Sequence, residues 1–346
     1  MTDTNHERSS TSIVSATQLI ESPQSLRPHV VLLGAGASLA ACPNGDAAGR
    51  ILPVMDNLVE VVGLQSIIPD STLESVPSRN FEAVYSRLLA QSDCGHIIKE
   101  VERRIERYFS ELVLPSHATI YDQLLVSLRP TDAVFTFNWD PFLFDAYKRN
   151  HLAVELPEIF FLHGNVRIGT CLRHDRWGPK EGQCPECGED FAAVPLLYPI
   201  EDKDYSKDPL IRRSWDAAEK LFRDAFTLTI FGYGAPDSDT DAVNLLQLAW
   251  MGRSGRKMEH IELIDTGCKQ LLRDRWAKFA PTHHDRITEE FEDSRLAGWP
   301  RRSCDALFYA MTEGKPCEKF PFPSLKDLEA LQTAAARIEE FEIEMQ

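Results

Sequence analysis

The sequence predicts an α/β fold with a Rossmann-like, doubly wound parallel sheet, and two observations support this. Short, nearly continuous apolar runs recur along the chain, as is typical of strands that helices bury on both faces. Segments with helical spacing, at residues 140–150, 209–224 and 239–251, separate several of these runs, so strand and helix alternate. The apolar runs lie at residues 29–33, 133–137, 159–162, 226–231 and 260–264.

The composition excludes some classes of function. The 346 residues include 53 acidic and 37 basic side chains, which gives a formal net charge of −16. A surface of this sign repels phosphate backbones and anionic lipid, so we expect no direct binding to nucleic acid or to a membrane. No apolar run approaches the roughly 18 residues that a bilayer span requires. The N-terminus lacks the apolar core of a secretory signal, so we expect a cytoplasmic protein.

The alternating pattern divides the chain into a core and additions to it. The core is predicted to comprise residues 28–63, 129–166 and 195–280. Residues 1–27, which begin with a polar stretch rich in Ser and Thr, are expected to form a flexible tail. Residues 64–128 contain no convincing strand but repeat apolar side chains at helical spacing, which predicts a helical insertion.

Residues 281–346 are predicted to form a C-terminal helical extension. Ser324 and Asp327 form a capping box that would open a helix running towards Glu344. An apolar stripe on this helix is expected to pack on its own domain, and the alternative is a contact between subunits. The stripe consists of Leu328, Leu331, Ala335 and Ile338.

Polar or glycine-rich residues follow each of the predicted strands. In open parallel sheets the ligand binds at the carboxyl ends of the strands, so these positions are the candidate site. Clusters at five equivalent positions are hard to explain by packing alone. They are the GAGAS segment at residues 34–38, Asn138 with Asp140, His163 with Gly164, the glycine-rich residues 232–239, and Asp265 with Gly267.

The GAGAS segment fits a phosphate-binding turn. Its two glycines allow the backbone to turn sharply and to approach a pyrophosphate, while the following helix offers its dipole and the Ser38 hydroxyl. The dinucleotide fingerprint has a third glycine where this chain has Leu39, although Asp56 lies 20 residues after Gly36, near the usual ribose-binding acid. A tight strand-to-helix turn without a ligand is the alternative interpretation.

Residues 167–194 are rich in Gly, Cys and charge, with few apolar residues to form a core. Such a module requires something other than packing to fold. The spacing of Cys171, His174, Cys184 and Cys187 supplies two pairs of ligands, as tetrahedral zinc requires, and with four protein ligands the zinc would be structural. Two alternatives remain: His174 is a solvated side chain and another residue completes the site, or Cys184 and Cys187 act in redox chemistry.

The order of these motifs resembles the sirtuin family and, more closely, its divergent bacterial NAD-hydrolysing branch. GAGAS, the TFNWD segment at residues 136–140, the LHG segment at 162–164, the cysteine cluster and FGYGAPDSD at 231–239 occur in the sirtuin order. This resemblance implies NAD+ as substrate and a site residue at each matching position. Gly34, Ala35, Gly36 and Ser38 would hold the pyrophosphate, Asn138 and Asp140 the nicotinamide ribose, and Gly232, Tyr233 and Asp265 the adenosine half. His163 would be the catalytic base.

Departures from the sirtuin pattern bear on the reaction. Sirtuin deacylases follow their zinc module with a segment ending in Phe-Gly-Glu, which residues 193–205 lack, and residues 41–46 contain no arginine. The helical insertion at 64–128 is similar to additions in bacterial relatives that hydrolyse NAD+. The zinc module, often missing from that branch, keeps deacylation as an alternative.

The resemblance therefore implies an NAD+ glycohydrolase that releases nicotinamide and ADP-ribose, acting as an NAD-depleting effector in bacterial anti-phage defence. It also implies a homo-oligomer and control by self-assembly or by a protein partner such as an ATPase. The alternatives are an NAD-dependent protein lysine deacylase and a non-catalytic subunit that binds NAD or ADP-ribose.

Overall fold

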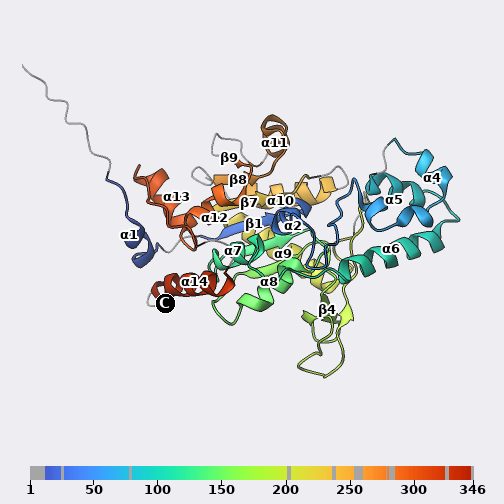
Figure 1. Ribbon diagram of the computed structural model, residues 1–346, viewed down its shortest axis with the longest axis horizontal. Coiled ribbons are helices and arrows are strands. Elements are labelled where there is room, and N and C mark those ends of the chain that lie inside the picture. The colour runs from blue at the N-terminus through green and yellow to red at the C-terminus, as the bar shows by residue number, and fades with distance from the viewer. Residues whose placement is uncertain are drawn as a thin grey trace, which may run out of the picture.

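A six-stranded parallel sheet forms the centre of the computed structural model (Figure 1). The structure describes residues 12–24, 27–77, 80–200, 204–235, 239–252, 260–277, 279, 285–323 and 327–343. The strands are β1 His29–Leu33, β2 Ala133–Thr136, β3 Glu158–Phe161, β7 Thr227–Phe231, β8 His260–Ile264 and β9 Asp285–Thr288. The predicted fold class is thus confirmed, and each of the five apolar runs forms a strand.

The strand order β3-β2-β1-β7-β8-β9 has a reversal at its centre. From β1 the chain adds β2 and β3 on one side and then crosses to add β7, β8 and β9 on the other. Connections therefore leave β1 and β7 in opposite directions, which opens a crevice at their carboxyl ends. Every residue of β1 and β7 is buried, which explains their apolar composition.

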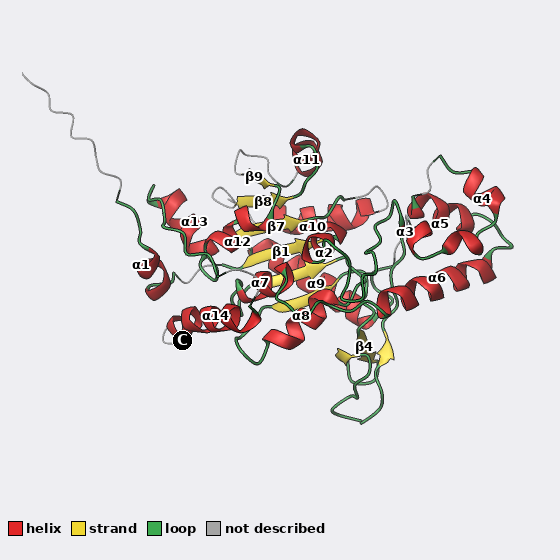
Figure 2. Ribbon diagram, viewed as in Figure 1, coloured by secondary structure: helices red, strands yellow, loops and turns green. Residues whose placement is uncertain are grey.

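Helices cover both faces of the sheet (Figure 2). The first face carries α2 Ala35–Ala41, α7 Ile120–Val126 and α8 Phe142–Asn150, and the second carries α9 Pro209–Asp224 and α10 Thr240–Met251. An Asp208 side chain caps the start of α9 by accepting from Leu210 N and Ile211 N. The helix α11 Lys269–Trp276 follows β8 and leads towards β9. None of the described helices is long and apolar enough to cross a membrane.

The predicted helical insertion projects from one end of the sheet (Figure 1). It contains η1 Leu64–Ser66, α4 Asp70–Glu74, α5 Phe81–Leu89 and α6 Gly95–Ser110, preceded by the short α3 Leu58–Val61. On α6 the side chains of Val101, Ile105 and Phe109 are buried, as their spacing predicts. The predicted insertion extends to residue 128 and so includes α7, but α7 packs on α8 and belongs to the core.

A small antiparallel sheet lies apart from the central one, at the lower edge of Figure 1. Its strands are β4 Ile168–Cys171, β5 Arg176–Pro179 and β6 Ala192–Ala193, in the order β5-β4-β6. Its apolar cluster consists of little more than Cys171, Cys184 and Phe191, so packing alone gives it little stability.

Both ends of the chain are more ordered than the sequence suggested. Within the expected flexible tail, α1 Ala16–Glu21 is capped by Ser15 and buries Leu19. Within the expected C-terminal helical extension, β9 pairs in parallel with β8 and becomes the sixth strand. The remaining elements there are η3 Phe291–Asp293, α12 Arg295–Gly298, α13 Ser303–Thr312 and α14 Leu328–Ile343.

The predicted C-terminal helix corresponds to α14. Ser324 of the proposed capping box lies outside the described residues. The apolar stripe of the helix faces its own chain, where Leu331 and Ala335 pack with Ala118, Val126 and Val154. The intrachain alternative is therefore the one that the structure supports.

Candidate active site

A cavity of about 370 Å³ opens at the carboxyl ends of β1, β2, β3 and β7, at the crevice where the strand order reverses. It brings together eight of the residues that the motifs predicted, from four separate places in the sequence. They are Gly34, Ala35, Ser38, Asn138, Asp140, His163, Gly232 and Tyr233. Gly36 and Asp265 are not among the lining residues.

The glycines hold the turn after β1 against the turn after β7. A Cβ on Gly34 would lie 2.5 Å from the Tyr233 Cα, and a Cβ on Gly36 would lie 2.7 Å from the Gly232 Cα. Gly232 has a φ of +60°. The Gly36 amide donates to the Gly232 carbonyl at 2.9 Å. In this conformation that amide is not open to a phosphate, so Gly36 contributes close packing rather than a ligand contact.

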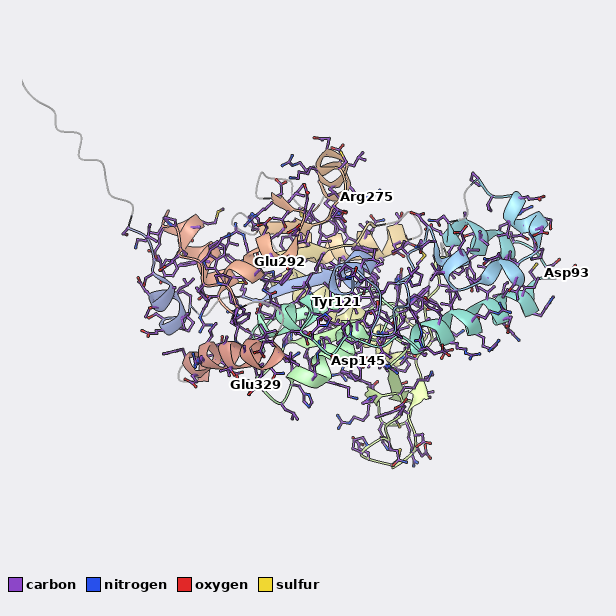
Figure 3. All side chains as sticks on the ribbon, in the orientation of Figure 1. Asp93, Tyr121, Asp145, Arg275, Glu292 and Glu329 are labelled. Carbon is purple, nitrogen blue, oxygen red and sulfur yellow. The ribbon has the colours of Figure 1, made fainter. Side chains whose placement is uncertain are left out.

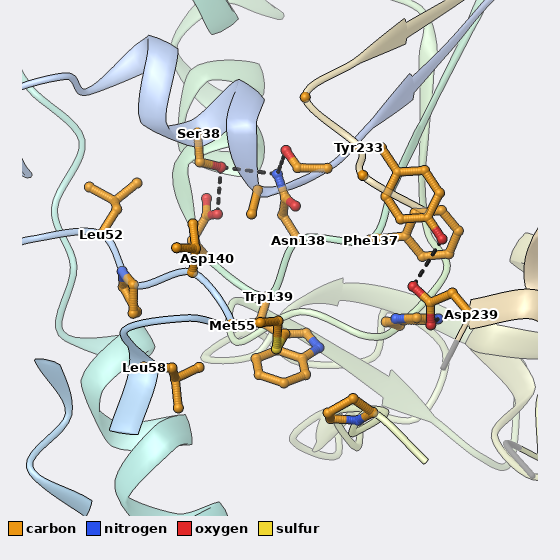
Figure 4. A pocket seen from close by; sticks show the side chains of 18 of the residues that line it. Ser38, Leu52, Met55, Leu58, Phe137, Asn138, Trp139, Asp140, Tyr233 and Asp239 are labelled. Atoms are coloured by element: carbon orange, nitrogen blue, oxygen red, sulfur yellow. Dashed lines mark hydrogen bonds and ion pairs between the residues drawn. The ribbon is translucent and has the colours of Figure 1, made fainter. Parts of the chain in front are cut away.

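Asn138 is held by a network of hydrogen bonds at the floor of the cavity (Figure 4). Its Nδ2 donates to the Gly34 carbonyl at 2.8 Å, and Ser38 Oγ and Tyr121 Oη lie at 3.0 and 3.1 Å. These acceptors account for the hydrogens of the amide group. The carbonyl oxygen Oδ1 is therefore the atom left to accept from a substrate hydroxyl or a water.

Asp140 belongs to the same network. Ser38 Oγ donates to its Oδ2 at 2.6 Å, and the Phe142 amide donates to its Oδ1 at 3.1 Å. Burial raises the pKa of the Asp140 carboxyl to about 6, although these two donors act in the opposite direction. Tyr121, from α7, also contacts Ser38 at 2.7 Å. No motif pointed to Tyr121, because it reaches the site only when α7 packs on the core.

His163 lies on the opposite side of the cavity, beside an acidic residue that the motif analysis did not single out. Its Nε2 lies 3.9 Å from Asp239 Oδ1, and both side chains are buried. The Tyr233 hydroxyl donates to the other carboxylate oxygen of Asp239 at 2.9 Å. Phe137 packs against both Tyr233 and His163, with its ring centroid 4.3 Å from that of Tyr233 and 4.6 Å from that of His163. A carboxylate so placed can stabilise a protonated imidazole.

The cavity also has an apolar wall, which the sequence analysis did not predict. Trp139 follows β2, Phe109 comes from α6 of the insertion, and Leu52, Met55 and Leu58 come from the segment after α2. Figure 4 shows Leu52, Met55, Leu58 and Trp139 across from Asn138. The cavity can therefore enclose a molecule with a polar sugar or phosphate part and a flat, uncharged ring.

Two further residues lie after β8, and only the second of them lines the cavity. Asp265 accepts from the Gly267 amide at 2.7 Å, which closes a local turn. Arg275, on α11, does line the cavity and donates through Nη1 to the Gly234 carbonyl. No sequence motif includes Arg275, and only the tertiary placement of α11, whose Trp276 ring lies 6.0 Å from that of Tyr233, brings it to this position.

The four predicted zinc ligands meet in one cluster at the tip of the small sheet. Their ligand atoms all lie within 4.8 Å of one another. Cys171 Sγ is 3.7 Å from Cys187 Sγ and 3.6 Å from His174 Nδ1, and Cys184 Sγ is 3.6 Å from the same nitrogen. Around tetrahedral zinc, bond lengths of about 2.3 Å to sulfur and 2.0–2.1 Å to nitrogen place ligands about 3.8 and 3.6 Å apart. The group, His174 included, could hold a structural zinc ion.

No family model matches the chain, and no curated protein matches it. Among solved structures, a Sir2 homologue in complex with ADP-ribose aligns with 15% identity and a TM-score of 0.36 over 86% of this chain and 96% of that one. A Sir2 homologue in complex with NAD aligns with 14% identity and a TM-score of 0.34 over 88% and 97%. A third structure, of Sir2 enzymes, aligns with 12% identity and a TM-score of 0.38 over 87% and 97%. Values this low do not assign an activity, so the function depends on the residues of the cavity.

Proposed function

We propose that the protein is a sirtuin-like NAD+ glycohydrolase that cleaves NAD+ to nicotinamide and ADP-ribose. The observation that carries the proposal is that Asn138 and His163 line one cavity together with Gly34, Ala35 and Ser38. The cavity lies where the strand order reverses, which is where doubly wound sheets bind dinucleotides.

Asn138 and His163 each have a role in breaking the bond between ribose and nicotinamide. As nicotinamide departs with the bonding electrons, positive charge develops on the ribose ring. Asn138 Oδ1 accepts from a ribose hydroxyl or from the attacking water and so fixes its position. His163, as the neutral imidazole, takes the proton that the water loses as its oxygen bonds to the ribose carbon. Nicotinamide leaves as a neutral molecule, and ADP-ribose retains the new hydroxyl.

The cavity wall opposite Asn138 suits the departing base. Nicotinamide is flat and gains neutrality as it leaves, so an apolar surface favours it over the charged ring of the substrate. Trp139, Phe109 and Met55 supply such a surface. The helical insertion thus completes the cavity, since Phe109 lies on α6.

Deacylation of protein lysine is the second candidate, favoured by the zinc-ligand cluster beside the core. Against it, residues 193–205 lack the Phe-Gly-Glu ending of deacylases. Part of this segment already lies along the cavity, with the Leu197 amide donating to the His163 carbonyl at 2.9 Å and Pro199 in the wall. A subunit that binds NAD+ or ADP-ribose without turnover is the third possibility.

One experiment separates the three. The purified chain is incubated with NAD+, with and without an acetylated peptide, and the products are resolved by chromatography. We expect nicotinamide and ADP-ribose in equal amounts without peptide. Acetyl-ADP-ribose formed only with peptide would indicate a deacylase, and no product in either case would indicate a binding subunit.

Two substitutions test the assigned roles. Asn138→Ala and His163→Ala should each lower kcat by about 10²- to 10⁴-fold, the usual contribution of general acid–base and positioning groups. His151→Ala, at the exposed C-cap of α8, is the matched control and should retain full activity. Wild-type activity in both cavity variants would remove this mechanism.

We further propose that the enzyme depletes cytoplasmic NAD+ in bacterial anti-phage defence, as a homo-oligomer or under the control of a protein partner such as an ATPase. The support is the sequence resemblance to the NAD-hydrolysing sirtuin branch. Cells expressing the protein should lose NAD+ after phage infection, whereas cells expressing the His163→Ala variant should not. Equal NAD+ levels in both kinds of cell would contradict the defence role. The NAD+ glycohydrolase activity would still be decided by the assay on the purified chain.

A further inference from the structure

The charge of the cavity wall raises the question of how it binds a dinucleotide. Three carboxylates line it, from Glu82, Asp140 and Asp239. Among the lining residues that the structure describes, Arg275 alone is a lysine or an arginine. The diphosphate of a dinucleotide carries two negative charges, so these carboxylates repel it unless a cation lies beside it. The position of the diphosphate in the cavity should therefore depend on Arg275.

The turn after β1 supplies few backbone donors of its own. The helix α2 has only 7 residues, which limits its dipole. The Gly36 amide donates to the Gly232 carbonyl at 2.9 Å, and the Ala37 amide donates to the Gly34 carbonyl at 3.0 Å. Most of the amides that could cradle a phosphate at this turn are thus used within the protein, and a side-chain donor is needed.

Arg275 lies where the two glycine-rich turns meet. Its Nη1 donates to the Gly234 carbonyl, and Gly234 follows Tyr233, whose Cα packs against Gly34. Figure 3 labels Arg275 where α11 meets the body of the molecule. A guanidinium has five N–H donors, and this contact uses one. The others are left to bind a planar or tetrahedral anion.

Arg273, also on α11, differs from Arg275 in that a carboxylate pairs with its charge. Arg273 Nε lies 3.3 Å from Asp285 Oδ2, so its charge is already paired, and it does not line the cavity. Over the described part of the chain, no carboxylate lies within ion-pair distance of Arg275. The two side chains therefore offer a matched comparison on one helix.

We infer that Arg275 is the residue that binds the diphosphate of a nucleoside diphosphate in this cavity, which in the proposed reaction is the pyrophosphate of NAD+. The inference rests on the proposed function, since it assumes that a dinucleotide occupies the cavity. Arg275 acts on binding and not on the chemical step, because the diphosphate lies on the far side of the ribose from the bond that breaks.

The test measures ligand affinity and turnover separately. Full-length wild type, Arg275→Gln, Arg275→Lys and Arg273→Gln are titrated calorimetrically with ADP-ribose and with adenosine, which lacks the diphosphate. We expect Arg275→Gln to weaken ADP-ribose binding about 10- to 100-fold, the usual loss for a charge-assisted hydrogen bond, and to leave adenosine binding unchanged. Arg275→Lys should lie between wild type and Arg275→Gln, and Arg273→Gln should match wild type. In the NAD+ assay, Arg275→Gln should raise KM and leave kcat unchanged.

The outcomes separate the inference from the proposed function. If wild type binds and hydrolyses NAD+ but Arg275→Gln binds ADP-ribose as tightly as wild type, the inference fails and the proposed function stands. An equal loss in Arg273→Gln would also overturn the inference, because general charge on α11 would then explain the effect. If wild type binds neither NAD+ nor ADP-ribose, the proposed function fails and the inference fails with it.

Discussion

Asp140 is a buried carboxyl in the centre of the molecule, and its burial should make folding stability depend on pH. Its pKa is raised from 3.8 to about 6, so the folded protein favours the protonated form. Stability from this group is complete below the unfolded pKa and is lost as pH rises through the folded pKa. A shift of about two pKa units corresponds to roughly 3 kcal/mol.

Asp140→Asn should remove this pH dependence. Between pH 4 and pH 7 the wild type should lose up to roughly 3 kcal/mol of unfolding free energy more than the variant does. Urea unfolding at the two pH values measures the difference. Asp216→Asn, at an exposed position on α9, should behave like wild type. A wild type that loses no more stability than Asp140→Asn would show that the carboxylate is solvated in the native state.

Asp239 should affect turnover through His163. Its Oδ1 lies 3.9 Å from His163 Nε2, and the Tyr233 hydroxyl holds its other oxygen. Asp239→Asn removes the charge that favours the protonated imidazole, so kcat should fall by about tenfold or more.

Tyr233→Phe is the companion variant for Asp239. It removes the hydroxyl that donates to Asp239 but keeps the ring that stacks on Phe137. Its effect on kcat should be smaller and in the same direction. A kcat loss in Asp239→Asn that is accompanied by a lower melting temperature would assign Asp239 a structural role only.

At the residue scale, site residues that belong to motifs could be predicted from the sequence. Site residues that reach the cavity only through the packing of helices could not. Asn138 and His163 follow apolar strands directly, and parallel strands bring their carboxyl ends to one edge. Tyr121 and Arg275 lie on helices, and nothing local distinguishes them from ordinary core or surface residues. Asp239 stands in a run of acidic residues, where only the tertiary structure singles out one carboxylate.

At the scale of elements, the five strands with apolar composition were predictable, including β3 at one edge of the sheet, whereas β9 at the other edge was not. Every residue of β1 and β7 is buried, and their sequences are mostly apolar. In β9 only Thr288 is buried, and the segment Asp-Arg-Ile-Thr shows no apolar run. β9 is only partly buried, so its sequence carries a weak pattern, whereas three of the four residues of the other edge strand, β3, are buried.

The zinc-ligand module is the element whose stability depends least on packing. Its apolar cluster contains Phe191 and two of the cysteines themselves, so metal binding should supply most of its folding energy. Cys184→Ser should abolish zinc binding and expose the module to proteolysis between β4 and β6. Metal analysis of the purified protein should find one zinc per wild-type chain.

The control for this variant is Cys268→Ser, which alters an exposed thiol outside the cluster. It should retain zinc and resist proteolysis like wild type. Stoichiometric zinc in Cys184→Ser would indicate that another residue completes the site. A zinc-free wild type that resists proteolysis would indicate that the module folds without metal.

At the scale of the whole molecule, a buried ion network ties the two ends of the described chain together. Arg301 and Arg302 are fully buried, and Glu342 of α14 accepts from both. Arg302 also donates to the Leu19 and Ile20 carbonyls of α1, at 3.2 and 3.0 Å. Burial lowers the pKa of Arg302, which shows how strongly its charge depends on these partners.

Glu342→Gln should therefore destabilise the molecule far more than its place near the chain end suggests. Removing one partner of a buried pair leaves an uncompensated charge, at a cost of about 3–5 kcal/mol, whereas exposed pairs contribute about 0–1 kcal/mol. The melting temperature should fall by several degrees, and limited proteolysis should release α14 and α1 together, because both contact Arg302. Glu340→Gln, exposed on the same helix, should melt like wild type. If the two variants melt alike, the arginines must find solvent or other acceptors when Glu342 is lost, and apolar packing of α14 and of α1 then holds these two helices.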